Sequence, residues 1–152
     1  MKVRHFADCL QERIDQLKNP TVLGLDPLLD YLPPSYTEKL SALDGNELEE
    51  AQAEAIYRFN RELIDATADI IPAVKPQIAY YEQYGPQGLV CFRKTLAYAR
   101  QKGMLTIADC KRNDIGSTAK AYSRAYLGEI LYGNETVATP FEADAITVNE
   151  IG

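Results

Sequence analysis

The chain has 152 residues, of which 46% are hydrophobic and 25% charged, and its formal net charge is −6. These values fit one globular domain with a core of its own. The net charge is negative and the sequence contains no run of basic residues, which argues against nucleic-acid binding, because that depends on clustered lysine and arginine. No apolar run approaches the ~20 residues of a membrane span, and the N-terminal residues lack the continuous apolar core of a signal peptide.

The first half of the chain predicts two helices, one strand and a long loop. Apolar residues at helical spacing predict a helix over residues 3–17. Residues 21–27, TVLGLDP, are typical of a short buried strand. Prolines and a glycine favour a loop over residues 28–45, and a second amphipathic pattern predicts a helix over residues 48–67.

The second half continues the alternation of strands and helices. One helix is expected to open at Gly85-Pro86 and to end before Gly103, and another to run over residues 117–131, ended by Gly133. Further strands are predicted at residues 71–81, 104–111 and 143–149. Strands that alternate with helices favour an α/β fold with a parallel sheet, here of four strands.

Charged side chains gather at the predicted C-terminal ends of these strands, where parallel sheets place their sites. Asp26 ends the first strand, Lys75 lies late in the second, and Asp109, Lys111 and Asp114 lie at or just after the end of the third. In an extended chain Asp109 and Lys111 point to the same face. An isolated Asp–Lys pair is often only a structural ion pair, but charges from three strands at one edge favour a functional site.

The cysteines and the single histidine limit the kinds of catalytic site that the chain can form. The three cysteines form no CxxC pair, which is typical of buried thiols in a reducing compartment, so we expect a cytoplasmic protein. His5 is the one histidine of the chain. A catalytic triad built on histidine and a metal site rich in histidine are therefore nearly excluded. Catalysis would therefore depend on Asp, Glu, Lys, Ser, Thr or Tyr.

Four sequence blocks resemble a known family. They are GLDP at 24–27, AVKPQIAYYEQYG at 73–85, DCKRND at 109–114 followed by IGSTA, and ADAITVN at 143–149. Together and in this order they resemble orotidine 5′-phosphate decarboxylases, above all the longer bacterial branch. The resemblance implies a carboxy-lyase of pyrimidine biosynthesis that converts orotidine 5′-monophosphate (OMP) to UMP and CO2 without a metal or cofactor.

Carried over to matching positions, the resemblance implies a catalytic network of alternating charges. Lys75, Asp109 and Lys111 would act from one subunit, and Asp114 would reach the neighbouring site across a homodimer. Lys111 would give a proton to the ring carbon that loses CO2. A fixed ammonium at that carbon stabilises developing negative charge without late reorganisation.

Substrate-binding residues are implied in the same way. Asp26 and Lys75 would bind ribose hydroxyls, and Ile115 and Thr118 would face the neighbouring site. The expected partners are thus a small nucleotide and a second copy of the chain, with no nucleic acid and no membrane.

The chain also departs from the family pattern. The family fold is a (β/α)8 barrel of ~250 residues, whereas four strands are predicted here, so we expect residues 1–152 to form a single partial domain, half of such a barrel. The family generally continues after the fourth strand with Asn-Pro-Tyr, but Asn149 is followed by Glu150-Ile151-Gly152. We therefore expect weak or no activity from this chain alone, and association through open sheet edges or with a second polypeptide.

Two alternatives remain. A related barrel enzyme, a sugar-phosphate decarboxylase or synthase, would require Mg2+, and the GLDP and AVKPQ blocks disfavour it. A half-barrel could also serve as an assembly or interaction module without activity.

Overall fold

A computed structural model describes residues 4–149, so Val3 and the Glu150-Ile151-Gly152 tail lie outside the described part. The helices are α1 (Phe6–Leu17), α2 (Pro34–Thr37), α3 (Gly45–Thr67), α4 (Ala79–Glu82), α5 (Gly85–Gln101) and α6 (Gly116–Tyr126). The strands are β1 (Val22–Leu25), β2 (Ala73–Pro76), β3 (Leu105–Ala108), β4 (Ile130–Tyr132), β5 (Glu135–Ala138) and β6 (Ala145–Ile146), and two 3-10 turns are η1 (Leu29–Tyr31) and η2 (Leu40–Ala42).

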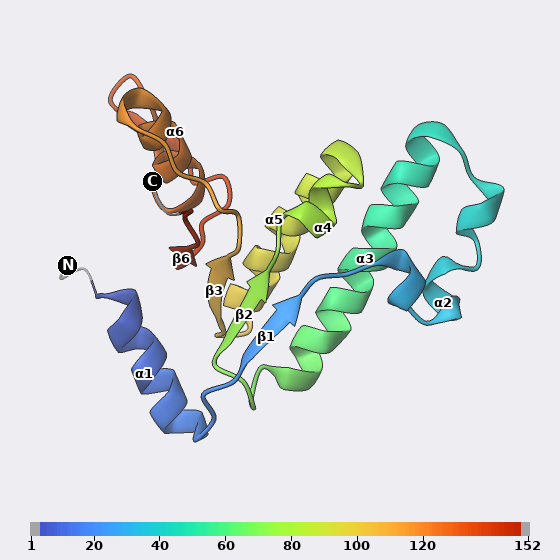
Figure 1. Ribbon diagram of the computed structural model, residues 1–152, viewed down its shortest axis with the longest axis horizontal. Helices are drawn as coiled ribbons and strands as arrows, with labels where there is room; N and C mark the ends of the chain where they lie inside the picture. Colours follow the sequence, from blue (N-terminus) through green and yellow to red (C-terminus); the bar gives the residue numbers. More distant parts are fainter. Residues whose placement is uncertain (1–3, 150–152) are drawn as a thin grey trace.

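Four strands form one parallel sheet in the order β1-β2-β3-β6, which confirms the predicted α/β fold (Figure 1). The strands run in the same direction, so their C-terminal ends lie along one edge of the sheet. The register pairs Gly24 with Lys75 and Ala108 with Ile146. Within residues 4–149, β1 and β6 are the outer strands of this sheet.

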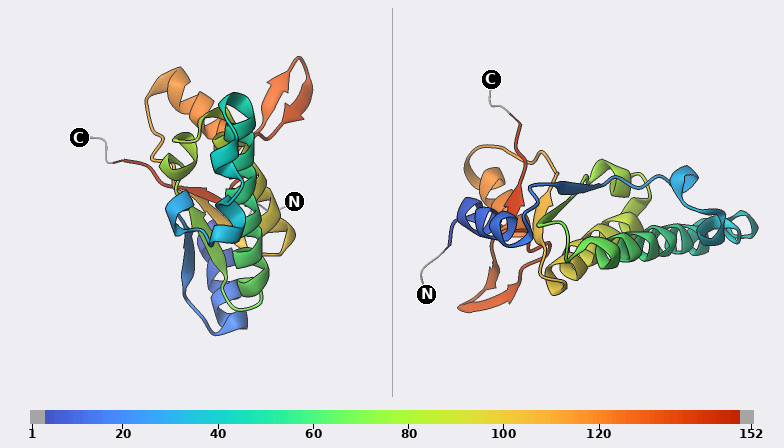
Figure 2. Two further views of the ribbon diagram at one scale, coloured as in Figure 1. Left: turned by 90° about the vertical axis from the view of Figure 1, so that its right-hand side faces the viewer. Right: turned by 90° about the horizontal axis from the view of Figure 1, so that it is seen from below.

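Helices α3 and α5 pack side by side along one face of the sheet (Figures 1 and 2). The apolar face of α5 explains this packing, because Phe92, Leu96 and Ala99 recur at helical spacing and are all fully buried. From α3, Ile56 and Ile64 are buried as well. Each large apolar side chain removed from water contributes about 1.5–3 kcal/mol to folding, so this layer is the main core.

A buried polar network ties this core to the end of β1. The Tyr81 hydroxyl donates to the carbonyl oxygen of Leu25 at 3.0 Å and accepts from the Asn60 amide at 3.0 Å. The same Asn60 amide nitrogen donates to the Thr95 hydroxyl at 3.2 Å. Burial raises the pKa of the Tyr81 hydroxyl well above its usual value, so the hydroxyl remains a neutral donor. The peptide just before Asp26 is thereby fixed to α3, α4 and α5.

The strand predicted over residues 71–81 is shorter than expected. It ends at Pro76, and residues 79–82 fold as α4 instead. The side-chain oxygen of Gln77 accepts the amide of Ala79 at 2.7 Å, which turns the chain into this helix.

The helix predicted over residues 117–131 is wrong over its last five residues, 127–131. Helix α6 ends at Tyr126, and β4 and β5 then form a separate antiparallel hairpin that projects from the body (Figure 2). The two residues between its strands are Gly133 and Asn134, and Gly133 has φ 64°. A Gly-Asn pair between two β-prone runs is a hairpin signal, so the sequence did carry this information.

No helix in the described part of the chain is both long and apolar enough to cross a membrane.

Candidate active site

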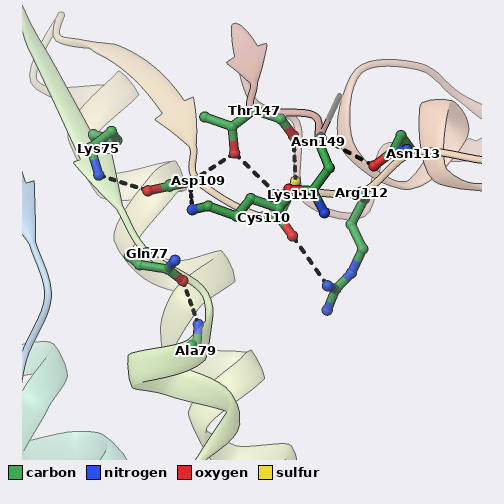
Figure 3. A network of polar contacts seen from close by, with 10 residues as sticks. All are labelled: Lys75, Gln77, Ala79, Asp109, Cys110, Lys111, Arg112, Asn113, Thr147 and Asn149. Atoms are coloured by element: carbon green, nitrogen blue, oxygen red, sulfur yellow. Dashed lines mark hydrogen bonds and ion pairs between the residues drawn. The ribbon is translucent and has the colours of Figure 1, made fainter. Parts of the chain in front are cut away.

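Three of the five charged residues predicted at the sheet edge, Lys75, Asp109 and Lys111, meet at the carboxylate of Asp109 (Figure 3). Asp109 follows β3 directly and is 7% exposed. Its Oδ2 accepts the ammonium of Lys75 from β2 at 2.8 Å, and its Oδ1 accepts the ammonium of Lys111 at 2.6 Å. The structure thus brings together three of the four residues to which the resemblance assigned catalysis.

The backbone of Asp109 is held by the end of β2. Its amide donates to the carbonyl of Pro76 at 3.0 Å, and its own carbonyl accepts the amide of Ile78 at 3.1 Å. These bonds extend the parallel pairing past the strand ends, with a bridge between Gln77 and Asp109. Since both sides of the peptide are anchored, the carboxylate leaves the sheet at a defined point beside Lys75.

Lys111 reaches the carboxylate by a route other than the predicted one. The expectation of an extended chain from Asp109 to Lys111 is wrong, because β3 ends at Ala108 and Lys111 has φ 49°, in the left-handed region. The amide of Cys110 donates to the carbonyl of Ala108 at 2.9 Å, which closes a tight turn. This turn, and not strand periodicity, folds the Lys111 side chain back onto Asp109.

The electrostatics favour an ionised carboxylate between two cations. Burial by itself would raise the pKa of Asp109, but hydrogen bonds from Lys111, Lys75 and Thr147 outweigh burial and lower the pKa from 3.8 to about 2. Two ammonium groups and one carboxylate leave one excess positive charge. The side chains of Lys75 and Lys111 are 35% and 50% exposed, so an anionic ligand can reach that charge from the rim.

The remaining predicted residues lie apart from this cluster. Asp26 is exposed at the end of β1 and lines a cavity of about 120 Å³ with Asn60, Leu63 and other residues. The Asp114 carboxylate accepts the amide of Ile115 at 2.7 Å, where α6 begins. Ile115 is 77% exposed, and Thr118 is exposed in the first turns of α6. Between residues 4 and 149, no hydrogen bond or ion pair joins these four to Lys75, Asp109 or Lys111.

Sequence reasoning missed Thr147. Its hydroxyl follows β6, donates to Asp109 Oδ1 at 2.7 Å and accepts the amide of Lys111 at 3.1 Å. Thr147 is a polar residue near the C-terminal end of the fourth predicted strand, residues 143–149, but the strand pattern does not distinguish it from Asn149 as a partner of Asp109.

Arg112 stabilises the turn that carries Lys111. Its guanidinium donates to the carbonyl of Cys110 at 3.1 Å and pairs with the Glu82 carboxylate of α4. The turn that carries Lys111 is therefore tied to α4 through Arg112. Among the described residues, no group of three or more His, Cys, Asp or Glu side chains is placed to hold a metal ion.

Comparison with known proteins yields one family. A family model described as "Orotidine 5'-phosphate decarboxylase / HUMPS family" matches residues 40–151. An orotidine 5'-phosphate decarboxylase of Rhodopirellula baltica is 41% identical over 144 residues, which cover 95% of this chain and 45% of the relative. One of Clostridium perfringens is 42% identical over 145 residues, covering 95% of this chain and 43% of the relative.

Solved structures agree with this result. A Toxoplasma gondii protein described as an orotidine-monophosphate-decarboxylase superposes with a TM-score of 0.69 at 30% identity, over 95% of this chain and 40% of its own. A Streptomyces avermitilis protein described as an orotidine 5'-phosphate decarboxylase superposes with a TM-score of 0.64 at 31% identity, over 84% of this chain and 40% of its own. The chain thus spans less than half the length of the relatives that it matches.

Proposed function

Because the chain belongs to the orotidine 5'-phosphate decarboxylase / HUMPS family, we propose that its Lys75–Asp109–Lys111 cluster is a centre for the decarboxylation of OMP. The observation that carries the proposal is the pair of ammonium groups on one buried carboxylate at the open edge of a parallel sheet. The cluster has one excess positive charge, which suits a substrate that is itself an anion.

Lys111 is the proton donor in this proposal. When the bond between the pyrimidine ring and the carboxylate breaks, CO2 leaves and the electron pair stays on the ring carbon. A fixed ammonium beside that carbon stabilises the developing charge, and one N–H proton of Lys111 then moves to the carbon to give UMP. The neutral lysine recovers its proton from water, since half of its side chain is exposed.

Asp109 and Lys75 prepare this step. Asp109 fixes the Lys111 ammonium at 2.6 Å, so the donor is oriented before the substrate arrives. Lys75 holds the other oxygen, and in this proposal it binds ribose hydroxyls together with Asp26, which follows β1. The buried carboxylate also repels the substrate's own carboxylate, which favours the loss of CO2.

Asp114, Ile115 and Thr118 serve a second copy of the chain in this proposal. Their exposure supports that role, and so does the lack of any bond from them to the Asp109 cluster of their own chain within the described residues. Asp114 of the partner subunit would supply the carboxylate that balances the excess positive charge.

A complementation assay tests the proposal. The R. baltica relative extends well beyond the 45% that this chain matches, and its remaining part can be expressed as a separate polypeptide. We expect OMP turnover to be weak or undetectable with this chain alone, because contacts to remote parts of a substrate normally drive the chemistry, and to appear when the second polypeptide is added.

Turnover is measured as CO2 release from OMP labelled in its carboxylate. Size-exclusion chromatography of the mixture shows whether the two polypeptides associate. A mixture that associates and binds UMP but releases no CO2 would contradict the proposed reaction.

A further inference from the structure

The hydroxyl of Thr147 joins the two residues on which the proposed chemistry depends. It donates its one proton to Asp109 Oδ1 at 2.7 Å and accepts the backbone amide of Lys111 at 3.1 Å (Figure 3). Thr147 itself is held in place, because its amide donates to the carbonyl of Ala108 at 3.1 Å and its carbonyl lies 3.9 Å from the Cys110 sulfur. These contacts hold the Thr147 hydroxyl in place between β3 and β6.

The backbone of Lys111 needs such a partner. Its φ of 49° lies in the left-handed region, which is uncommon and unfavourable for residues other than glycine. Backbone conformations of this kind persist where surrounding contacts over-determine them. The bond to Thr147 satisfies the Lys111 amide in this conformation, and this conformation is the one that returns the ammonium to Asp109.

Asp109 also depends on the hydroxyl for its orientation. Lys111 reaches Oδ1 on a long side chain that is 50% exposed, and Lys75 reaches Oδ2 on one that is 35% exposed. Thr147 has a short side chain, and its χ1 is restricted by branching. Among the three donors to the carboxylate, Thr147 is the least free to move, so its bond to one oxygen sets the rotation of the carboxylate between the two lysines.

We propose that Thr147 is a positioning residue, whose hydroxyl sets both the left-handed turn at Lys111 and the orientation of the Asp109 carboxylate. It acts through these two residues and needs no contact with substrate. The consequence for turnover rests on the proposed function, whereas the consequence for local structure does not.

The chain contains a matched control at the other end of the same pair of strands. The Thr106 hydroxyl in β3 donates to the Asp144 carboxylate at 2.8 Å and accepts the Asp144 amide at 3.1 Å. Thr106 is fully buried, whereas Thr147 is half-buried, and the partner of Thr106, Asp144, lies just before β6, whereas Thr147 lies just after it. A Thr106→Val variant thus removes the same kind of bond without touching the cluster.

The first test measures local structure in the unliganded chain. In Thr147→Val we expect hydrogen exchange at the Lys111 amide to accelerate by about tenfold or more, since the amide loses its hydrogen-bond acceptor and exchange reports local opening. NMR titration of the Asp109 carboxyl carbon should show its pKa rising from about 2 by about one pH unit. Thr147→Ser keeps a hydroxyl and should restore both values.

The groups that face Asp109 in this titration are Lys75 from β2, Lys111 from the turn and the Thr147 hydroxyl after β6. Thr106→Val keeps all three, so it should lower global stability while leaving both readouts unchanged. If Thr147→Val leaves Lys111 exchange and Asp109 titration as they are, or shifts them no more than Thr106→Val does, the positioning role is overturned.

The second test measures OMP turnover in the complemented mixture. Thr147→Val should lower kcat about tenfold to a hundredfold with KM changed less than threefold, because a reacting group displaced by about 1 Å loses rate and not binding. Thr147→Ser should recover most of kcat. A rise in KM alone would contradict the positioning role. If a wild-type mixture that associates and binds UMP is inactive, the proposed function fails, and the local readouts still decide the role of Thr147.

Discussion

Lys75 and Lys111 hold opposite oxygens of one carboxylate, that of Asp109, at 2.8 and 2.6 Å. One lysine lies within a regular strand, and the other lies in a left-handed turn after the neighbouring strand. Two flexible cations are thereby held close together despite their mutual repulsion, because the buried anion between them is ionised at neutral pH. The predictions below test this cluster and the core that supports it.

Removing the ammonium of Lys111 should abolish turnover. In the complemented mixture we expect Lys111→Ala to lower kcat by at least about 10²–10⁴, the usual contribution of a positioned general acid. CO2 release measures the effect. Lys102→Ala is the control, because Lys102 pairs with Asp65 at 2.6 Å away from the cluster. Activity within about tenfold of wild type would remove Lys111 from the proton-donor role.

Asp109 should make stability depend on pH in the acid range. Its pKa is lowered to about 2 in the folded chain, below the value of about 3.9 of an unfolded chain. Such a group stabilises the fold fully above about pH 4, and its contribution, about 2 kcal/mol, is lost as pH falls toward 2. We expect urea unfolding followed by circular dichroism to show wild type more stable than Asp109→Asn at pH 6.

The difference between wild type and Asp109→Asn should shrink steadily between about pH 4 and pH 2. A difference that stays constant over that range would show that the carboxylate is not held in its ionised form by the two lysines.

Gly88 should not accept a side chain. A Cβ at this position in α5 would lie 1.8 Å from the carbonyl oxygen of Tyr81, so either α4 or α5 would have to move. We expect Gly88→Ala to lower the free energy of unfolding by about 3 kcal/mol or more. Gly24→Ala is the comparison, because no atom lies within 4 Å of its added Cβ, and its effect should stay within about 0.5 kcal/mol.

The hydroxyl of Tyr81 should stabilise the core. Tyr81→Phe removes the buried hydrogen bonds to the Asn60 amide and to the carbonyl of Leu25, although the Asn60 amide keeps its bond to Thr95, and we expect a loss of about 1–3 kcal/mol. Chemical denaturation measures it. Tyr98→Phe is the control. The hydroxyl that it removes donates to the exposed carboxylate of Asp65, so the stability of the fold should change much less. Equal effects of the two variants would mean that the buried network contributes nothing of its own.

Much of the fold could be predicted because its determinants are local. The helical spacing of Phe92, Leu96 and Ala99 defines a face that must be buried, whatever covers it. Strands alternating with helices restrict the sheet to a parallel one with its charged ends along one edge. For the same reason Asp109 and Lys75 could be expected at that edge, and the order of the four sequence blocks was enough to indicate the family.

Only the tertiary structure decided how these residues meet. The left-handed turn at Lys111 and its bond to the Thr147 hydroxyl depend on β6, which returns to the site 36 to 38 positions later in the chain. Strand periodicity does not contain that contact, because it arises from how two distant segments pack and not from the preferences of either. The side chains that form the cluster were therefore evident from the sequence, but the hydroxyl that orients them became visible only when β3 and β6 were placed side by side.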